Sequence, residues 1–139
     1  KEKLIPVVIN SVINEKKIPV YGDGKNIRDW LYVEDHASAI DSILHQGEVG
    51  ETYLIGGGCE LSNIELINKI IKILDIKLKR VTGHSEYLIE FVADRKGHDF
   101  RYAIDFSKLT NQTSWKPSDN FEKNLNKTIE WYLKKGSDK

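Results

Sequence analysis

The sequence has no methionine, one cysteine and no excess of charge of either sign. The single Cys59 cannot form an intramolecular disulfide, which fits a reducing compartment. The 21 Lys and Arg residues balance the 21 Asp and Glu residues, so the chain lacks the basic excess that draws proteins to nucleic acid or anionic membranes. No apolar run approaches the roughly 20 residues that span a bilayer, and the charged start is not a secretory signal. We therefore expect a cytoplasmic protein that binds neither nucleic acid nor membrane.

The missing methionine also leaves the sequence, which starts at Lys1, without an initiator residue. We therefore expect a fragment, a processed product or a trimmed form of a longer protein. Its 139 residues are the size of one ordinary domain, and 40% hydrophobic with 30% charged residues is typical of a globular protein with a single core. The sequence thus predicts one domain over residues 1–139.

Several segments place apolar residues at helical spacing. The best supported begins at Ser62 and Glu65, which have the spacing of a capping box and precede an apolar stripe. Asp35 and Asp105 stand where helix N-caps are expected, and Gly47 stands where the helix after Asp35 would stop. The expected helices span approximately residues 4–13, 36–46, 63–74, 106–109 and 121–135.

Short runs rich in β-branched and aromatic residues predict strands between these helices. A glycine-rich cluster over residues 22–26 predicts a turn after the first of them. The expected strands span residues 18–21, 29–33, 53–55, 88–92 and 102–104. Mixed helices and strands of this kind predict an α/β fold.

The sequence offers no convincing catalytic or cofactor-binding constellation. The glycines at 56–58 lack the spacing of a dinucleotide-binding or Walker-type loop. Tyr21 and Lys25 have the four-residue spacing of a short-chain dehydrogenase pair, but that chemistry needs a helix, and two glycines between them favour a turn. The histidines are scattered without a metal-ligand spacing. No catalytic, cofactor-binding or metal-binding residue is therefore predicted.

Five segments together resemble one enzyme family, the dTDP-glucose 4,6-dehydratases of the extended short-chain dehydrogenase/reductases. The resemblance covers nearly the whole chain, in the order and approximate spacing of the C-terminal portion of that family. It implies a small mixed α/β substrate-binding domain that lacks the N-terminal Rossmann domain. Lys96 departs from the family, which usually has Pro there, and Leu54 replaces a common Asn. The matching segments are residues 3–6, 18–24, 28–36, 50–53 and 93–105.

The resemblance also implies a set of substrate-binding residues. Arg28 and Arg95 match the arginines that bind the diphosphate, whose oxygens suit the planar donors of a guanidinium. The segment ending in Tyr21 matches the one that lies against the base, Asn63 matches an asparagine that contacts the nucleotide, and His98 completes an Asp-Arg-x-Gly-His segment. The implied residues are Lys3, Leu4, Ile5, Pro6, Pro19, Val20, Tyr21, Arg28, Asn63, Asp94, Arg95 and His98.

By this resemblance, the parent enzyme converts dTDP-glucose to dTDP-4-keto-6-deoxyglucose with NAD, as a homodimer. The catalytic residues and the NAD site would lie in the missing Rossmann domain, so we expect this chain alone to bind no NAD and to be inactive. Two alternatives stay open. The chain could be a stand-alone, non-catalytic nucleotide-sugar-binding module, or the corresponding part of a UDP-sugar epimerase or decarboxylase.

Overall fold

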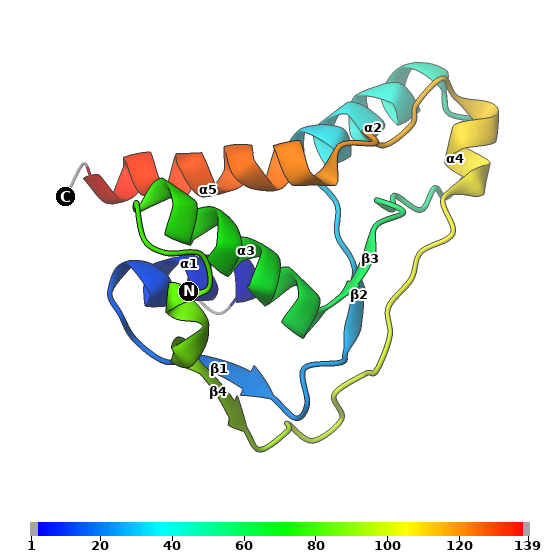
Figure 1. Cartoon of the computed structure of the whole chain (residues 1–139). Helices are drawn as coiled ribbons and strands as arrows, with labels where there is room; N and C mark the ends of the chain where they lie inside the picture. Colours follow the sequence, from blue (N-terminus) through cyan, green and yellow to red (C-terminus); the bar gives the residue numbers. More distant parts are fainter. Residues whose placement is uncertain (1–2, 138–139) are drawn as a thin grey trace. The chain divides into compact units, whose positions relative to one another are not determined.

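The computed structural model describes residues 3–137, which form two compact units joined by four crossings of the chain. Within the described residues, unit 1 comprises 3–26, 62–100 and 122–137, and unit 2 comprises 27–61 and 101–121. The strands form two separate two-stranded sheets, one pairing β1 with β4 and the other pairing β2 with β3 (Figure 1). The mixture of short strands and longer helices confirms the expected α/β fold.

Unit 1 is built on a parallel strand pair and helices that cover it. Strand β1 (Ile18–Tyr21) pairs with β4 (Ile89–Val92), with Ile18 opposite Ile89 and Tyr21 opposite Val92. Helix α1 packs against α3, and the 3-10 helix before β4 packs against both. The helical elements of unit 1 are α1 (Leu4–Ile13), α3 (Asn63–Lys77), the 3-10 helix (His84–Leu88) and α5 (Phe121–Ser137), which begins at its boundary.

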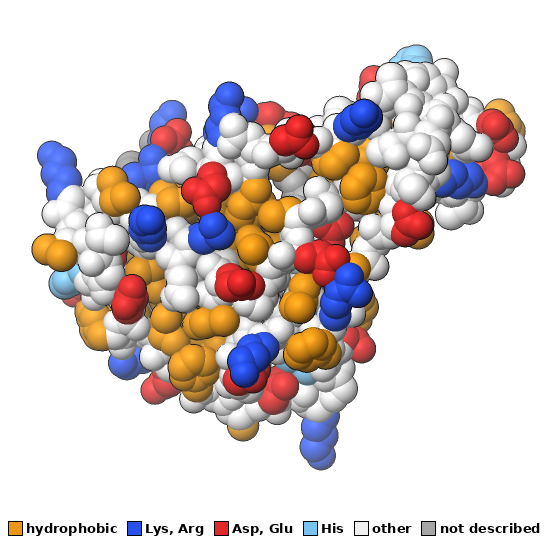
Figure 2. All heavy atoms as spheres, turned by 45° about the vertical axis from the view of Figure 1, so that its right-hand side comes forward, with side chains coloured by type: hydrophobic (Ala, Val, Ile, Leu, Met, Phe, Trp, Pro, Cys, Tyr) orange, Lys and Arg blue, Asp and Glu red, His pale blue; other side chains and the backbone are white. Residues whose placement is uncertain are grey.

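The core of unit 1 follows from the apolar stripes of these helices. Helix α3 buries Leu66, Ile67, Ile70, Ile71 and Leu74, the face that its sequence pattern predicts. Helix α1 and strand β1 add further buried aliphatic side chains, and α5 contributes two. These contributions are Val8, Ile9, Val12, Ile18, Val20, Leu125 and Ile129. On the face drawn in Figure 2, hydrophobic side chains of unit 1 also reach the surface among charges of both signs.

Unit 2 has a smaller core. Strand β2 (Ile27–Asp29) pairs with β3 (Glu60–Ser62), which crosses the boundary into unit 1. Helix α2 (Val33–Gln46) and helix α4 (Ser107–Gln112) enclose a cluster of three buried residues. That cluster consists of Ala39, Leu109 and Trp115, with Ile43, Tyr53, Ile55 and Phe106 packed around it.

Several strand boundaries expected from the sequence are wrong. Of the strand expected over 29–33, only Asp29 belongs to a strand, because β2 spans Ile27–Asp29 and α2 begins at Val33. Residues 53–55 form no strand, since their backbone pairs with no other strand within residues 3–137, although Tyr53 and Ile55 pack onto the unit 2 cluster. Residues 102–104 form no strand either; the preceding Arg101 makes an isolated parallel bridge with Ile27, whose carbonyl accepts from the N–H of Tyr102 at 3.1 Å.

The helix ends also differ in detail. The N-cap of α2 is Tyr32, and Asp35 lies in the first turn, where its carboxylate accepts hydrogen bonds from the backbone N–H and hydroxyl of Ser118 at 3.2 and 2.6 Å. Helix α4 runs to Gln112, beyond its expected end. Among residues 3–137, the structure contains no helix that is both long and apolar enough to cross a membrane.

Candidate functional site

The carboxyl ends of β1 and β4 bring two predicted segments to one edge of unit 1. Because the strands are parallel, the chain leaves both of them on the same side, as at the ligand-binding edge of open α/β sheets. The backbone N–H of Gly22 donates to the carbonyl of Val92 at 3.0 Å, which ties the start of one loop to the end of the other strand. The loops that follow are residues 22–26 and 93–100.

The loop over residues 22–26 is the tight turn that the glycines predict. Gly22 and Gly24 have φ of 59° and 72°, in the left-handed region that glycine adopts without a steric cost. Gly24 donates its N–H to the carbonyl of Tyr21 at 3.1 Å and accepts from the N–H of Ile64 at 3.0 Å. Asn63 donates its N–H to the carbonyl of Asn26 at 3.0 Å. The turn after β1 is thus joined to the first residues of α3.

The N-terminus of α3 has the predicted capping box. The N–H of Glu65 donates to the Ser62 hydroxyl at 3.3 Å, and the N–H of Ser62 donates to the Glu65 carboxylate at 2.8 Å. Hydrogen bonds from the Ser62 hydroxyl and backbone lower the pKa of Glu65. The N–H groups of Asn63, Ile64 and Glu65 all have protein partners. Asn63 can therefore contact a ligand through its side-chain amide, whereas its backbone N–H is already engaged.

The loop after β4 is closed by a clamp between Asp94 and His98. Nδ1 of His98 lies 2.7 Å from Oδ1 of Asp94, and the N–H of Arg95 donates to the same oxygen at 2.8 Å. Since a carboxylate only accepts, His98 carries the proton on Nδ1. The hydrogen bond from His98 is the main cause that lowers the pKa of Asp94. This clamp defines the path of residues 94–98.

The clamp packs against the end of β1. The Tyr21 and His98 rings meet edge to face, with centroids 6.4 Å apart, and the His98 side chain is only 3% exposed. Because its side chain is buried, His98 serves to hold Asp94 in position within the loop. Arg95 is exposed, and its guanidinium makes no hydrogen bond or ion pair with any residue in 3–137. A planar, charged donor group is therefore presented at the same edge as the Tyr21 ring.

The remaining residues of unit 1 predicted to bind substrate differ in access. Pro19 is exposed, whereas Val20 is buried, so only the backbone of Val20 can meet a ligand. Lys3 is exposed at the N-cap of α1, and the next residues of the predicted segment, Leu4, Ile5 and Pro6, are half-buried.

Arg28 belongs to unit 2, where it lies on β2. Its Nη1 donates to the carbonyl of Ile27 at 2.6 Å, and its guanidinium carbon lies 4.7 Å from the centroid of the Tyr102 ring. Tyr102 is not among the residues that the sequence predicts for the site. The only local signal is that Tyr102 is an aromatic residue in a short β-prone run. Such a run does not indicate contact with Arg28, which is distant in the sequence.

The glycines of residues 56–58 do not form a dinucleotide-binding loop. The N–H groups of Gly57 and Cys59 donate to the two carboxylate oxygens of Asp29, at 2.8 and 3.0 Å. A Cβ on Gly57 would lie 2.4 Å from the carbonyl oxygen of Trp30, so this backbone packs against the protein itself. A pyrophosphate would meet engaged donors and the negative charge of Asp29. These residues therefore do not fit NAD.

The other chemistries considered from the sequence have no geometric support. Tyr21 ends a strand, and Lys25 lies in the turn, where its amine forms an ion pair with Asp23 at 3.2 Å. Tyr21 and Lys25 therefore do not share a helix face, in agreement with the turn that the glycines predict. Within residues 3–137, no three His, Cys, Asp or Glu side chains gather in a way that could hold a metal ion.

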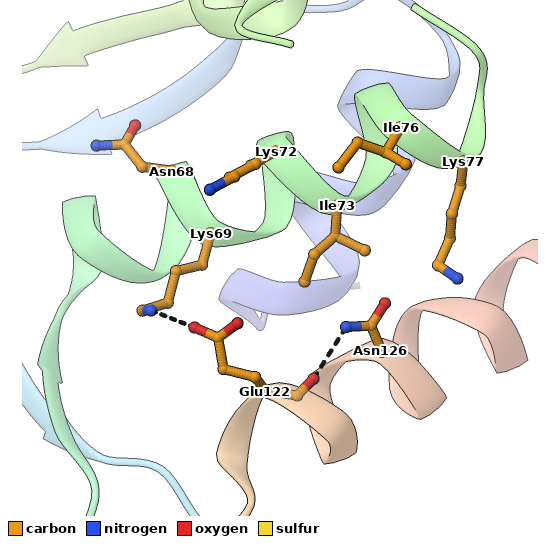
Figure 3. Close-up of a pocket in the computed structure, with 8 residues that line it drawn as sticks. All are labelled: Asn68, Lys69, Lys72, Ile73, Ile76, Lys77, Glu122 and Asn126. Carbon is orange, nitrogen blue, oxygen red and sulfur yellow. Dashed lines mark hydrogen bonds and ion pairs between the residues drawn. The ribbon is translucent and has the colours of Figure 1, made fainter.

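A separate pocket of about 430 Å³ lies between α3 and α5 (Figure 3). Lys69 and Lys77 on α3 bridge to Glu122 and Glu130 on α5, at 2.6 and 2.7 Å. The lining contains none of the residues predicted to bind substrate, and its lysines on α3 are mostly engaged by these carboxylates. The edge at the end of β1 and β4 is therefore the better candidate site.

Comparison with known proteins supports a single family. Residues 1–128 match the family model described as GDP-mannose 4,6 dehydratase. Over 135 residues the chain is 50% identical to a probable dTDP-glucose 4,6-dehydratase from Sinorhizobium fredii, covering 97% of this chain and 38% of that protein. It is 48% identical over 132 residues to the dTDP-glucose 4,6-dehydratase of Salmonella typhimurium, covering 95% of this chain and 36% of that protein.

A solved structure extends this similarity to the fold. The dTDP-glucose 4,6-dehydratase of Bacillus anthracis, solved in complex with NAD, matches with a TM-score of 0.82 and 47% identity. The match covers 96% of this chain and 40% of that one. The resemblance to dTDP-glucose 4,6-dehydratases is thus confirmed, as is the expected α/β fold class. The chain spans about two fifths of the length of these relatives.

Proposed function

The chain belongs to the GDP-mannose 4,6 dehydratase family, and on this premise we propose that it is the nucleotide-sugar-binding part of a dTDP-glucose 4,6-dehydratase. The observation that carries the proposal is the loop over 94–98, which carries Arg95, is closed by the Asp94–His98 clamp and packs against Tyr21 through His98. The high identity to dTDP-glucose 4,6-dehydratases favours a dTDP-sugar over other nucleotide sugars.

Each part of a dTDP-sugar calls for a different residue. Arg95 of unit 1 and Arg28 of unit 2 are each assigned a role in phosphate binding, because guanidinium donors match phosphate oxygens and stay charged at physiological pH. The base is assigned to the segment from Pro19 to Tyr21, where the exposed ring offers an apolar face. Asn63 contributes its side-chain amide to the nucleotide. Asp94 and His98 act in this proposal by holding Arg95.

The start of α1 completes the proposed substrate-binding surface. Lys3 is exposed there and supplies a cation, while Leu4, Ile5 and Pro6 supply the half-buried apolar segment that closes on the substrate. With Tyr21, Asn63 and Arg95, this segment completes the part of the proposed site that unit 1 supplies.

The proposed overall reaction converts dTDP-glucose to dTDP-4-keto-6-deoxyglucose with loss of water. The described residues contribute binding and orientation, which raise the rate by fixing the sugar in a reactive position. Because residues 56–58 do not fit NAD, we assign the cofactor and the catalytic residues to a Rossmann domain outside this sequence. In this proposal the full enzyme is cytoplasmic and homodimeric, and this sequence forms its C-terminal domain.

Calorimetric titration of the native protein with dTDP and with UDP tests the proposal. We expect Arg95→Ala to weaken dTDP binding about 10- to 100-fold, as expected for the loss of a hydrogen bond to a charged group. Lys96→Ala removes an exposed cation from the same loop and is the matched control, with an effect below about twofold, typical of a screened surface charge. If both variants lost the same dTDP affinity, the loop would attract the phosphates only through its net positive charge, and the specific role of Arg95 would be refuted. A preference for UDP would favour an epimerase or decarboxylase, and no binding of either would refute the proposal.

A further inference from the structure

The guanidinium of Arg28 lies over the ring of Tyr102. The guanidinium carbon lies 4.7 Å from the ring centroid, within the distance at which a cation is attracted to an aromatic face. The carbonyl of Ile27 accepts both from Nη1 of Arg28, at 2.6 Å, and from the N–H of Tyr102, at 3.1 Å. One backbone carbonyl therefore anchors the arginine and the tyrosine together.

The segment that carries Tyr102 is itself held in register. Arg101 and Ile27 form a parallel bridge, which places residues 101–102 alongside β2. The guanidinium of Arg101 makes a two-pronged hydrogen bond to Glu60 on β3, at 2.6 and 2.8 Å, and this pairing lowers the pKa of Glu60. Ile27 on β2 and Glu60 on β3, both in unit 2, thus fix the backbone from which the Tyr102 ring extends.

The position of the ring matters because of the shape of a guanidinium. All five N–H donors of an arginine lie in the plane of the group, and a contact with an aromatic ring restrains the guanidinium without occupying any of these donors. A phosphate recognised through two oxygens requires that plane in a particular orientation.

We propose that Tyr102 is a positioning residue, which orients Arg28 for the diphosphate of the nucleotide. This inference rests on the proposed function, since it presupposes that Arg28 binds phosphate. Tyr102 is 54% exposed, so its ring is not explained by burial in a core. A positioning role explains why this exposed ring lies at Arg28, next to β2.

The test compares affinities for dTDP and for thymidine, which lacks phosphate, in the native protein. We expect Tyr102→Leu to weaken dTDP binding about two- to fivefold, the range of an exposed cation–aromatic contact, and to leave thymidine binding unchanged. Tyr102→Phe keeps the ring and should retain the affinity of the unaltered protein. Tyr87→Leu is the matched control, because Tyr87 is 56% exposed and has the Lys17 amine 5.8 Å from its ring centroid.

The outcomes separate this inference from the function on which it rests. Arg28→Ala should weaken dTDP binding by about tenfold or more, as expected for a charged hydrogen bond to phosphate. If Arg28→Ala weakens binding and Tyr102→Leu does not, the positioning role is wrong while the phosphate role stands. If Arg28→Ala has no effect, both are wrong. Equal loss of dTDP and thymidine in Tyr102→Leu, or loss in Tyr102→Phe, would also overturn the role of the ring.

Discussion

Replacement of Gly24 by alanine tests the turn that joins Tyr21 to the start of α3. Gly24 has φ of 72°, and an added Cβ would lie 2.8 Å from Cγ1 of Val20 and 3.0 Å from Cβ of Ile64. The left-handed backbone alone costs an alanine about 1–2 kcal/mol. Crowding against two packed aliphatic side chains adds about 1–3 kcal/mol. We therefore expect Gly24→Ala to lower the free energy of unfolding by about 2–5 kcal/mol.

Gly97 provides the matched control in the same unit. Its φ is 70°, but an added Cβ would meet no atom within 4 Å, so Gly97→Ala should lower the free energy of unfolding by only about 1–2 kcal/mol. Urea denaturation followed by circular dichroism gives both values, provided that the denaturant dependence of the free energy is the same in both variants. If Gly24→Ala cost no more than Gly97→Ala, the close approach of the turn to α3 would be refuted.

Three further predictions concern unit 1. Ser62→Ala removes the N-cap of α3 and should lower the free energy of unfolding by about 0.5–2 kcal/mol in urea denaturation; no loss would contradict the cap. Because the hydrogen bond from His98 lowers the pKa of Asp94 below 3.8, the clamp should be complete above that pH and be lost as pH falls through the lowered value. Carboxyl-carbon NMR checks this, and an unshifted titration would contradict it. Lys69→Ala breaks an exposed ion pair with Glu122 and should cost below about 1 kcal/mol in urea denaturation, less at high salt; a salt-independent loss would show that packing dominates.

Elements governed by local chemistry could be predicted from the sequence. The capping box of Ser62 and Glu65 and the apolar stripe after it identify α3, because both act within a few turns of one helix. Strand β1 and the turn after it follow similarly from β-prone residues and glycines. The aromatic and β-branched residues over 29–33 predict a strand, but β2 ends at Asp29, and Val33, which is 72% exposed, begins α2. Asp29 there binds the N–H groups of Gly57 and Cys59, which no local pattern indicates.

The site could be predicted only in part. Family resemblance named Tyr21, Asp94, Arg95 and His98, but only the parallel pairing of β1 with β4 explains why they meet at one edge. This pairing joins strands far apart in the sequence, and their short patterns do not specify partners. Contact between Arg28 and Tyr102 depends in the same way on the bridge beside β2.

Hydrogen–deuterium exchange of the native protein with and without dTDP tests the central claim most directly. Binding at the edge formed by β1 and β4 should slow exchange of backbone amides in residues 21–26 and 94–98, which the turn and the clamp place together. Protection at these two segments would support the proposed nucleotide site. Protection confined to the pocket between α3 and α5, or no protection by dTDP, would contradict it.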